Sequence, residues 1–239
     1  MQFAIVNHST DTSITSAILS QIASAIERQL FEHYAPFWES SGAHVAFYSD
    51  LKTVPKNAVV IAIFDNSDQP GALGYHDVTP DGRPYARIFW IPIKNSGGSL
   101  FQDSNSLSVT ISHEILEVIG DPYASFWAAQ YSTNMLYALE LCDAVESESY
   151  FIDGIAVSNF VGPRFFDENG AGPYDWLGQQ EGGHVTKPFQ TLLGGYQIVA
   201  VNLTNITQTW GENYPEWKKE TKSHQAARTA KRIARSGKQ

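Results

Sequence analysis

The chain has 239 residues, of which 43% are hydrophobic and 13% aromatic, and its net charge is −9. These values are typical of a folded globular protein with one sizeable core, and no stretch approaches the roughly 20 apolar residues that a membrane-spanning helix needs. The single cysteine, Cys142, excludes an intrachain disulfide and a metal site made of several cysteines, so we expect a reducing compartment.

The first part of the chain predicts a mixed sheet and one long helix. Its start lacks the basic and apolar regions of a signal peptide, so none is expected. Residues 2–7, 44–49 and 58–65 predict strands, and the last is apolar on both faces, as a central strand would be. From about residue 13 to residue 34, apolar residues recur every three or four positions, which predicts a helix. Residues 71–93 predict two strands joined by the turn TPDGRP.

The middle of the chain predicts two further helices. The first covers about residues 106–119, with Ser106 or Asn105 as its N-cap, and Gly120 followed by Asp-Pro ends it. A second helical pattern covers about residues 125–142. Beyond it the chain is rich in glycine, aromatic residues and short strands. We therefore predict an α+β fold with a mixed sheet, two successive helices and an irregular C-terminal half.

The end of the chain is strongly basic. Residues 218–239 carry eight of the sixteen Lys and Arg and one acid, Glu220, so this segment is +7 while residues 1–217 are −16. Such a segment is either a solvated arm or a binding element for nucleic acid, anionic lipid or an acidic protein surface. We expect one domain over residues 1–215 and a basic tail over residues 216–239.

One short motif carries chemistry. In the predicted helix of residues 106–119, the sequence HEILE places His113 and Glu117 four residues apart on one face, with Glu114 beside them. This is the arrangement of the H-E-x-x-H zinc helix, in which the glutamate is the general base, with glutamate in place of the second histidine. A carboxylate ligates zinc at about 2.0–2.2 Å, so the replacement is compatible with zinc, while manganese, iron and calcium stay open.

Three features of the surroundings support a metal. The helix is otherwise apolar, and buried charges need pairing or a metal. Gly120 would let Asp121 turn toward the site. Farther along, Glu140 or Asp143 could supply a further carboxylate from the end of the second predicted helix. The alternative is a structural network of histidine and carboxylates without metal.

The layout resembles zincins, the metallopeptidase fold in which an active-site helix is followed by a helix bearing a third ligand. The segments SHEILEVIGDP, LELCDAVESESYFIDGIAVSNFVGPRFFD and TKPFQTLLGGYQIV resemble more closely a family of phage and bacterial proteins with an HExxE motif. The resemblance implies a metallopeptidase-like fold and a phage context. It implies His113 as first ligand, Glu114 as base, Glu117 as second ligand, and Glu140 or Asp143 as third.

The chain departs from ordinary zincins, because the second histidine is missing and Tyr123 stands where one subclass has a third histidine. Tyr123 is close enough in sequence to serve as an oxyanion donor. His184 is a candidate extra ligand or electrophile, and His76 a candidate cleft residue beside an edge strand, although single loop histidines are more often exposed. Asn159 and Asp167 are candidate supporting residues, more typical of turns or caps.

Two functional hypotheses follow. The first is a zinc-dependent hydrolase, most simply a peptidase, in which Glu114 activates water and the edge strand within residues 71–92 binds an extended peptide. The second is a virion or assembly protein on a zincin-like scaffold, inactive as an enzyme, whose residues 218–239 contact other virion proteins or nucleic acid. The corresponding locations are the cytoplasm of a bacterial host and the phage particle.

Overall fold

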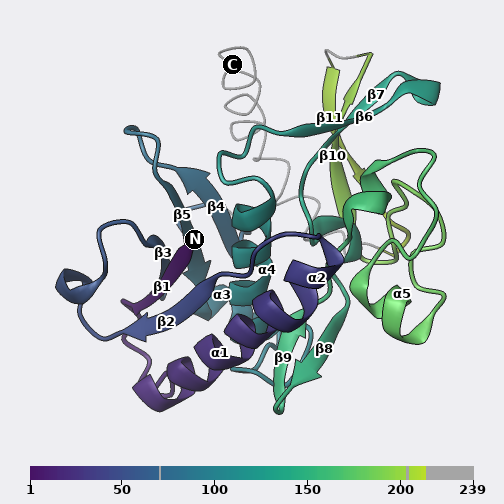
Figure 1. Ribbon diagram of the computed structural model, residues 1–239. Helices are drawn as coiled ribbons and strands as arrows, with labels where there is room; N and C mark the ends of the chain where they lie inside the picture. Colours follow the sequence, from purple (N-terminus) through teal and green to yellow (C-terminus); the bar gives the residue numbers. More distant parts are fainter. Residues whose placement is uncertain (70, 203–204, 214–239) are drawn as a thin grey trace.

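A computed structural model describes residues 1–69, 71–202 and 205–213. A five-stranded sheet forms its N-terminal part, in the order β2-β1-β3-β5-β4 (Figure 1). Strands β2, β1, β3 and β5 are parallel, and β4 pairs antiparallel with β5. The bounds are β1 Gln2–Asn7, β2 His44–Tyr48, β3 Val59–Phe64, β4 Gly74–Val78 and β5 Pro84–Phe89. These strands confirm the predicted ones, including the hairpin of residues 71–93.

The predicted helix of residues 13–34 is confirmed, although its geometry changes along its length. Helix α1 (Ser16–Arg28) begins where the side chain of Thr15 accepts a hydrogen bond from the amide of Ile18. It continues as a π-helix (Gln29–Tyr34) and ends in the short α2 (Ala35–Phe37). The apolar face of α1 is buried because its leucine and isoleucines recur at helical spacing. Two short helices follow elsewhere, a 3-10 turn at Leu51–Thr53 and α3 at Trp90–Asn95.

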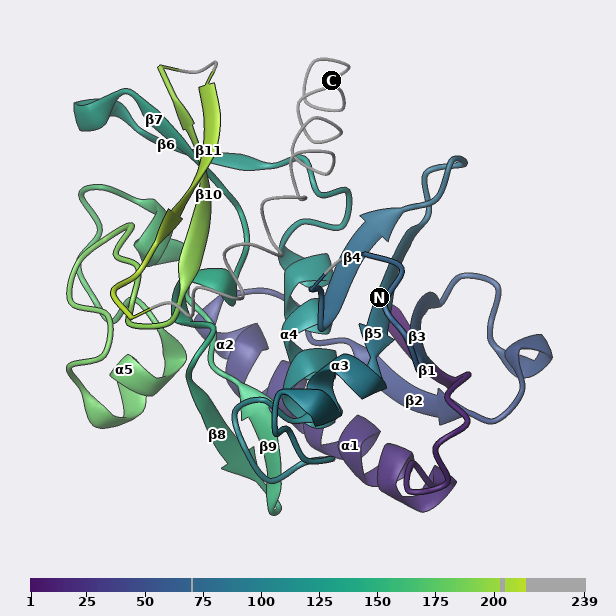
Figure 2. The same cartoon turned by 180° about the vertical axis from the view of Figure 1, so that it is seen from behind.

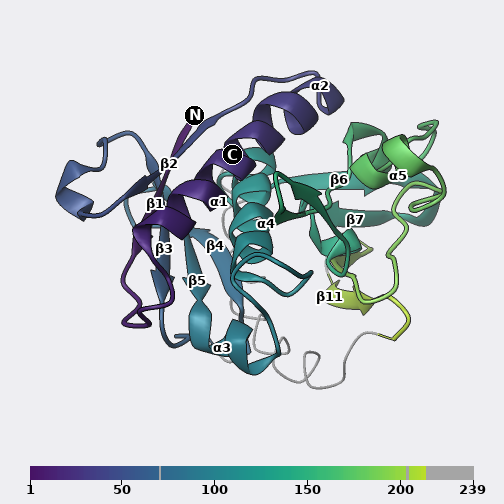
Figure 3. The same cartoon turned by 90° about the horizontal axis from the view of Figure 1, so that it is seen from below.

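Helix α4 (Leu107–Gly120) is the predicted motif helix. The side chain of Ser106 accepts from the amide of Val109, so Ser106 is the cap, and the helix ends at Gly120 as expected. The helix packs against β4 and β5 on one side and against β9 (Ile155–Ser158) on another. Figures 1 and 3 show α4 between the five-stranded sheet and a second sheet formed by the C-terminal half.

The predicted helix of residues 125–142 is wrong, because this segment forms an antiparallel hairpin. Its strands are β6 (Trp127–Gln130) and β7 (Met135–Ala138), and Asn134 in the left-handed conformation helps to close the turn between them. The other side of β7 pairs with β10 (Tyr196–Val201), which pairs with β11 (Asn205–Trp210). Pairing with a distant strand overrides the helical spacing, and aromatic residues suit such a sheet.

The remaining described elements are short. They are the hairpin β8 (Ser149–Ile152) and β9, helix α5 (Trp176–Glu181), and 3-10 turns at Tyr131–Thr133, Asp143–Val145 and Pro163–Phe166. In Figure 2, the hairpin of β8 and β9 lies below α4, and α5 lies on the side of the second sheet. The chain thus has an α+β fold with a mixed sheet. No helix among residues 1–69, 71–202 and 205–213 has the length and apolar character of a membrane span. The predicted domain boundary near residue 215 and the basic tail lie outside the described residues.

Candidate metal centre

Helix α4 carries the three motif residues into the interior. Glu114 and Glu117 are 5% and 4% exposed, and the His113 side chain is 13% exposed. Around them, Ile111, Ile115, Leu116 and Val118 are fully buried, so both faces of the helix are covered. The prediction that these polar residues lie within a buried helix is confirmed, and burying ionised groups requires compensating charge or a metal.

Glu117 stands between two histidines. Its Oε1 lies 2.9 Å from Nε2 of His113, one helical turn away, as the spacing predicts. Its Oε2 lies 3.3 Å from Nδ1 of His76, on strand β4. The two oxygens of a single carboxylate therefore face imidazoles that come from different elements.

Glu140 and Asp143 reach the same place from the loop after β7, not from a helix. Leu141 between them is fully buried against the end of α4: a Cβ built on Gly120 would lie 2.7 Å from Cγ of Leu141. The amide of Val161 also holds the carbonyl of Leu141, at 2.8 Å. With the loop fixed in this way, Oδ1 of Asp143 lies 3.3 Å from Nε2 of His113. Glycine at position 120 thus permits the approach that brings the carboxylates in.

His76 is the site residue that sequence reasoning ranked too low. It is 1% exposed, and its Nδ1 lies 3.4 Å from Oε2 of Glu114 while its Nε2 lies 3.8 Å from Oε2 of Glu140. The predicted hairpin contained the necessary signal, because an edge strand followed by an active-site helix can turn a side chain toward that helix. The alternation of buried and exposed residues along a strand could not single out His76, since Tyr75 and Asp77 on the same strand are also buried.

The two histidines and Glu117 have shifted pKa values because they face opposite charges. Burial by itself would lower the pKa of His76, but the charge of Glu140 and the nearby carboxylates of Glu114 and Glu117 raise the pKa to about 10. Burial likewise opposes the shift at His113, whose pKa is held well above 6.5 by Glu117 and Asp143. The pKa of Glu117 lies well below 4.5, against burial, chiefly because of His113. The arrangement therefore favours the ionised form of Glu117.

A buried polar network holds the helix in place behind the site. Ser112, next to His113, donates a hydrogen bond of 2.7 Å to Oε1 of Gln29, at the start of the π-helix. Gln29 donates through Nε2 to the carbonyl of Ser158 at 2.8 Å and to the hydroxyl of Tyr150 at 3.0 Å. The amide of Ser158 in turn donates a hydrogen bond of 3.1 Å to the hydroxyl of Ser112, so the three residues form a closed ring of hydrogen bonds. This network links the π-helix, α4 and β9, and it fixes the rotation of α4.

The donor set fits a divalent cation. His76, Glu117 and Glu140 offer one ligand atom each within 4.8 Å of one another, and so do His113, Glu114 and Glu117. In addition, Oε2 of Glu114 is buried and makes no hydrogen bond within the part of the chain that the structure describes. Nitrogen and carboxylate donors in this number suit zinc, iron or manganese. The buried groups therefore can hold a metal ion, and nothing in the set selects zinc.

The supporting residues expected from the sequence have other surroundings. Asp121 is fully buried, and its Oδ2 accepts hydrogen bonds from the amides of Ser125 and Phe126 at 2.7 and 2.8 Å. It fixes the turn that leads from α4 into β6. Tyr123 lies in that turn with 48% of its surface exposed. Cys142 is buried, and burial raises the pKa of its thiol, as expected for a cysteine that is not a nucleophile.

His184 belongs to a separate cluster beside α5. Its Nδ1 lies 2.8 Å from Oε1 of Glu148, and the three side chains of Glu148, Asp175 and His184 lie close enough to share an ion. However, the carboxylate oxygens of Glu148 and Asp175 already accept hydrogen bonds. Asn159 donates to both carboxylates at 2.8 Å, and the amides of Gly178 and Val185 donate to Asp175. Asn159 is therefore a structural link in this cluster, which is itself a hydrogen-bonded support for the loop.

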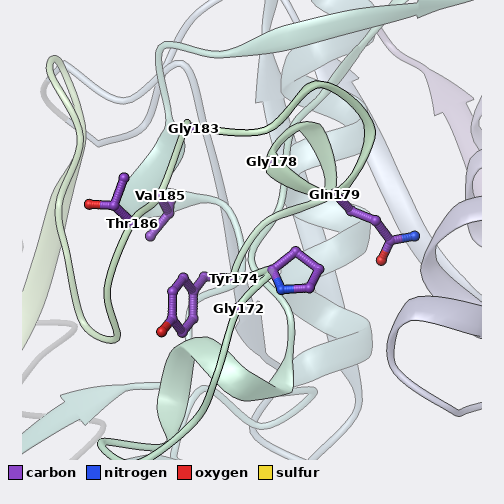
Figure 4. A pocket seen from close by; sticks show the side chains of 8 residues that line it. Gly172, Tyr174, Gly178, Gln179, Gly183, Val185 and Thr186 are labelled. Carbon is purple, nitrogen blue, oxygen red and sulfur yellow. The ribbon is translucent and has the colours of Figure 1, made fainter.

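Next to this cluster lies a hollow of about 540 Å³ (Figure 4). The side chains of Tyr174, Gln179 and Thr186 stand around it. The other five lining residues have no polar side-chain atom: Gly172, Pro173, Gly178, Gly183 and Val185. No histidine or acid lines it.

Asp167 lies at the end of the 3-10 turn Pro163–Phe166, where it accepts a hydrogen bond from the amide of Asn169 at 3.0 Å, as a turn residue does.

Comparisons of the chain with protein-family models, with curated proteins and with solved structures found no match. The resemblance to zincins and to the phage and bacterial HExxE family therefore stays a prediction from the motifs.

Proposed function

We propose that this protein is a metal-dependent hydrolase whose substrate is a peptide. The observation that carries the proposal is the convergence of five predicted residues, from a helix and a distant loop, around buried ligand atoms. His113 and Glu117 are 2.9 Å apart, and Asp143 lies 3.3 Å from His113. Imidazole nitrogens and carboxylate oxygens are the donors that a divalent cation of this kind takes. The peptide as substrate is taken from the resemblance to zincins.

In this proposal His113, Glu117 and Asp143 would hold a divalent cation, with zinc as the expected ion. When bound, such an ion lowers the pKa of water toward about 7 and polarises a carbonyl group. Glu114, the neighbour of His113 on α4, takes the proton of the attacking water at its carboxylate and passes it to the leaving amine. Its Oε2 is buried, makes no hydrogen bond within the described residues and lies 3.4 Å from Nδ1 of His76.

The test is the variant Glu114→Gln, which keeps the shape of the side chain and removes its basicity. We expect hydrolysis of a mixture of unstructured peptides to fall by about 10²–10⁴-fold, the contribution of a positioned general base. Bound metal, measured by elemental analysis, should stay as in the natural chain. Glu32→Gln is the matched control, because Glu32 is half exposed and pairs with Arg28. Equal turnover in the Glu114 and Glu32 variants rules out this mechanism.

The assembly-protein hypothesis depends on the basic segment of residues 218–239, which lies outside the described residues. It stays a prediction. Removing the segment should abolish salt-sensitive DNA binding without changing metal content if that hypothesis holds.

A further inference from the structure

The carboxylate of Glu117 is placed to serve two ions. One oxygen faces His113 at 2.9 Å and the other faces His76 at 3.3 Å. A carboxylate that ligates a single ion through one oxygen leaves its second oxygen for another partner. Here the second oxygen faces the imidazole of His76, on strand β4. The carboxylate of Glu140 lies 3.8 Å from the other nitrogen of that ring.

Each histidine has its own carboxylate from the loop after β7. Asp143 lies 3.3 Å from Nε2 of His113, and Glu140 lies 3.8 Å from Nε2 of His76. The loop thus supplies one carboxylate for each of the two histidines that flank Glu117. His76, Glu117 and Glu140 form a complete three-ligand group, and all three are buried.

The formal charges match two ions better than one. Glu114, Glu117, Glu140 and Asp143 carry −4 when ionised, and the two imidazoles are neutral when they bind metal. One divalent cation held by His113 leaves −2, or −1 when the imidazole of His76 carries a proton, and two cations leave none, which reduces the cost of burial. Independently of this count, Oε2 of Glu114, on a residue 5% exposed, lies in the same cluster without a hydrogen bond from the described residues.

We propose that the centre is dinuclear, with Glu117 bridging a cation held by His113 and Asp143 and a second cation held by His76 and Glu140. This inference rests on the proposed function only in sharing His113, Glu117 and Asp143 as ligands. The carboxylate-rich donor set favours manganese, iron or zinc in both positions. Two ions at the separation of about 3.5–4 Å found in two-metal sites would contact both the attacking and the leaving groups of a substrate.

The experiment uses the full chain, stripped of metal and titrated with Mn²⁺. Equilibrium dialysis counts bound ions, and electron paramagnetic resonance distinguishes coupled pairs from isolated ions. The natural chain should bind two Mn²⁺ and give a spin-coupled signal. His76→Asn and, independently, Glu140→Gln should bind one and give the signal of isolated Mn²⁺. Glu117→Gln should weaken both sites by at least about tenfold.

His184→Gln is the control, because it changes a histidine paired with a carboxylate in the other cluster and should keep two ions. Circular dichroism of each metal-free variant shows whether it is folded, and the two independent variants protect the test against failure of one. A natural chain that binds one ion, with the number unchanged in His76→Asn and Glu140→Gln, overturns the dinuclear centre. Binding of no ion overturns it as well.

The outcomes separate this inference from the proposed function. Two bound ions with no hydrolysis of any peptide leave the dinuclear centre standing and remove the hydrolase. One bound ion with hydrolysis that depends on Glu114 leaves the hydrolase standing and removes the second site.

Discussion

Nδ1 of His76 on strand β4 lies 3.3 Å from Oε2 of Glu117 on helix α4. This contact joins the edge of the five-stranded sheet to the motif helix, and it brings a histidine outside the motif to the centre of the buried cluster. The centre therefore depends on the packing of α4 against β4 as much as on the spacing within α4.

Replacing Gly120 with alanine should loosen the loop that carries Glu140 and Asp143. The new Cβ would lie 2.7 Å from Cγ of Leu141, so the leucine must move. We expect the free energy of unfolding to fall by about 1–3 kcal/mol, the usual cost of overpacking. Metal affinity should fall by about 10-fold, as for other changes behind the ligands. Leu141→Ala in the same chain removes the clash and should restore part of the affinity. An unchanged affinity in Gly120→Ala contradicts the role of this contact.

Gly74→Ala tests the position of Glu114. A Cβ at residue 74 would lie 2.9 Å from both Oε1 of Glu114 and Cγ2 of Thr110. Displacing the carboxylate should lower kcat by about 10²-fold while metal content stays constant, because misplacement of about 1 Å has effects of this size. Adding Thr110→Ser removes one of the two clashes and should recover part of the loss. Loss of metal in parallel with activity would show a general disruption instead.

Gln29→Leu tests the polar network behind α4. The leucine would leave the hydroxyl of Ser112 and the carbonyl of Ser158 without their partner in a fully buried position. We expect the free energy of unfolding in urea to fall by about 1–3 kcal/mol for each unsatisfied group. Gln102→Leu, at an exposed position, should change it by less than about 0.5 kcal/mol. Similar values for the two variants would show that the network adds little stability.

The pair of His184 and Glu148 should make stability depend on pH. A hydrogen bond to Glu148 raises the pKa of His184 above 6.5 in the folded chain. The pair therefore stabilises the fold fully below pH 6.5, and this contribution is lost as the pH rises through the folded pKa. The difference in unfolding free energy between the natural chain and His184→Gln should shrink over that interval. A difference that stays constant from pH 5 to pH 9 would refute the pairing.

Local chemistry explains why much of the first half was predictable. Helix α4 follows from an apolar run with a serine cap and a terminal glycine, and the positions of His113, Glu114 and Glu117 follow from helical geometry. The parallel strands are short apolar runs, and the hairpin of β4 and β5 is marked by a turn sequence. Each of these features depends on residues close together in the chain.

Long-range pairing explains what could not be predicted. Residues 127–138 have apolar residues at helical spacing, but β10, far along the chain, pairs with β7 and makes the segment a hairpin. The element that carries Glu140 and Asp143 was mistaken for the same reason, because both residues follow β7 and do not end a helix. His76 was undervalued for the same reason, since its partners Glu117 and Glu140 belong to other elements.

The most direct test of the metal centre is an anomalous-scattering map of crystals of the full chain grown with Zn²⁺ or Mn²⁺, collected at the metal's absorption edge. The account predicts density within about 2.0–2.2 Å of Nε2 of His113 and of the Glu117 carboxylate. A second peak beside His76 and Glu140 would support the dinuclear centre. Crystals that show no peak among these side chains, or one only at Glu148, Asp175 and His184, would contradict the account.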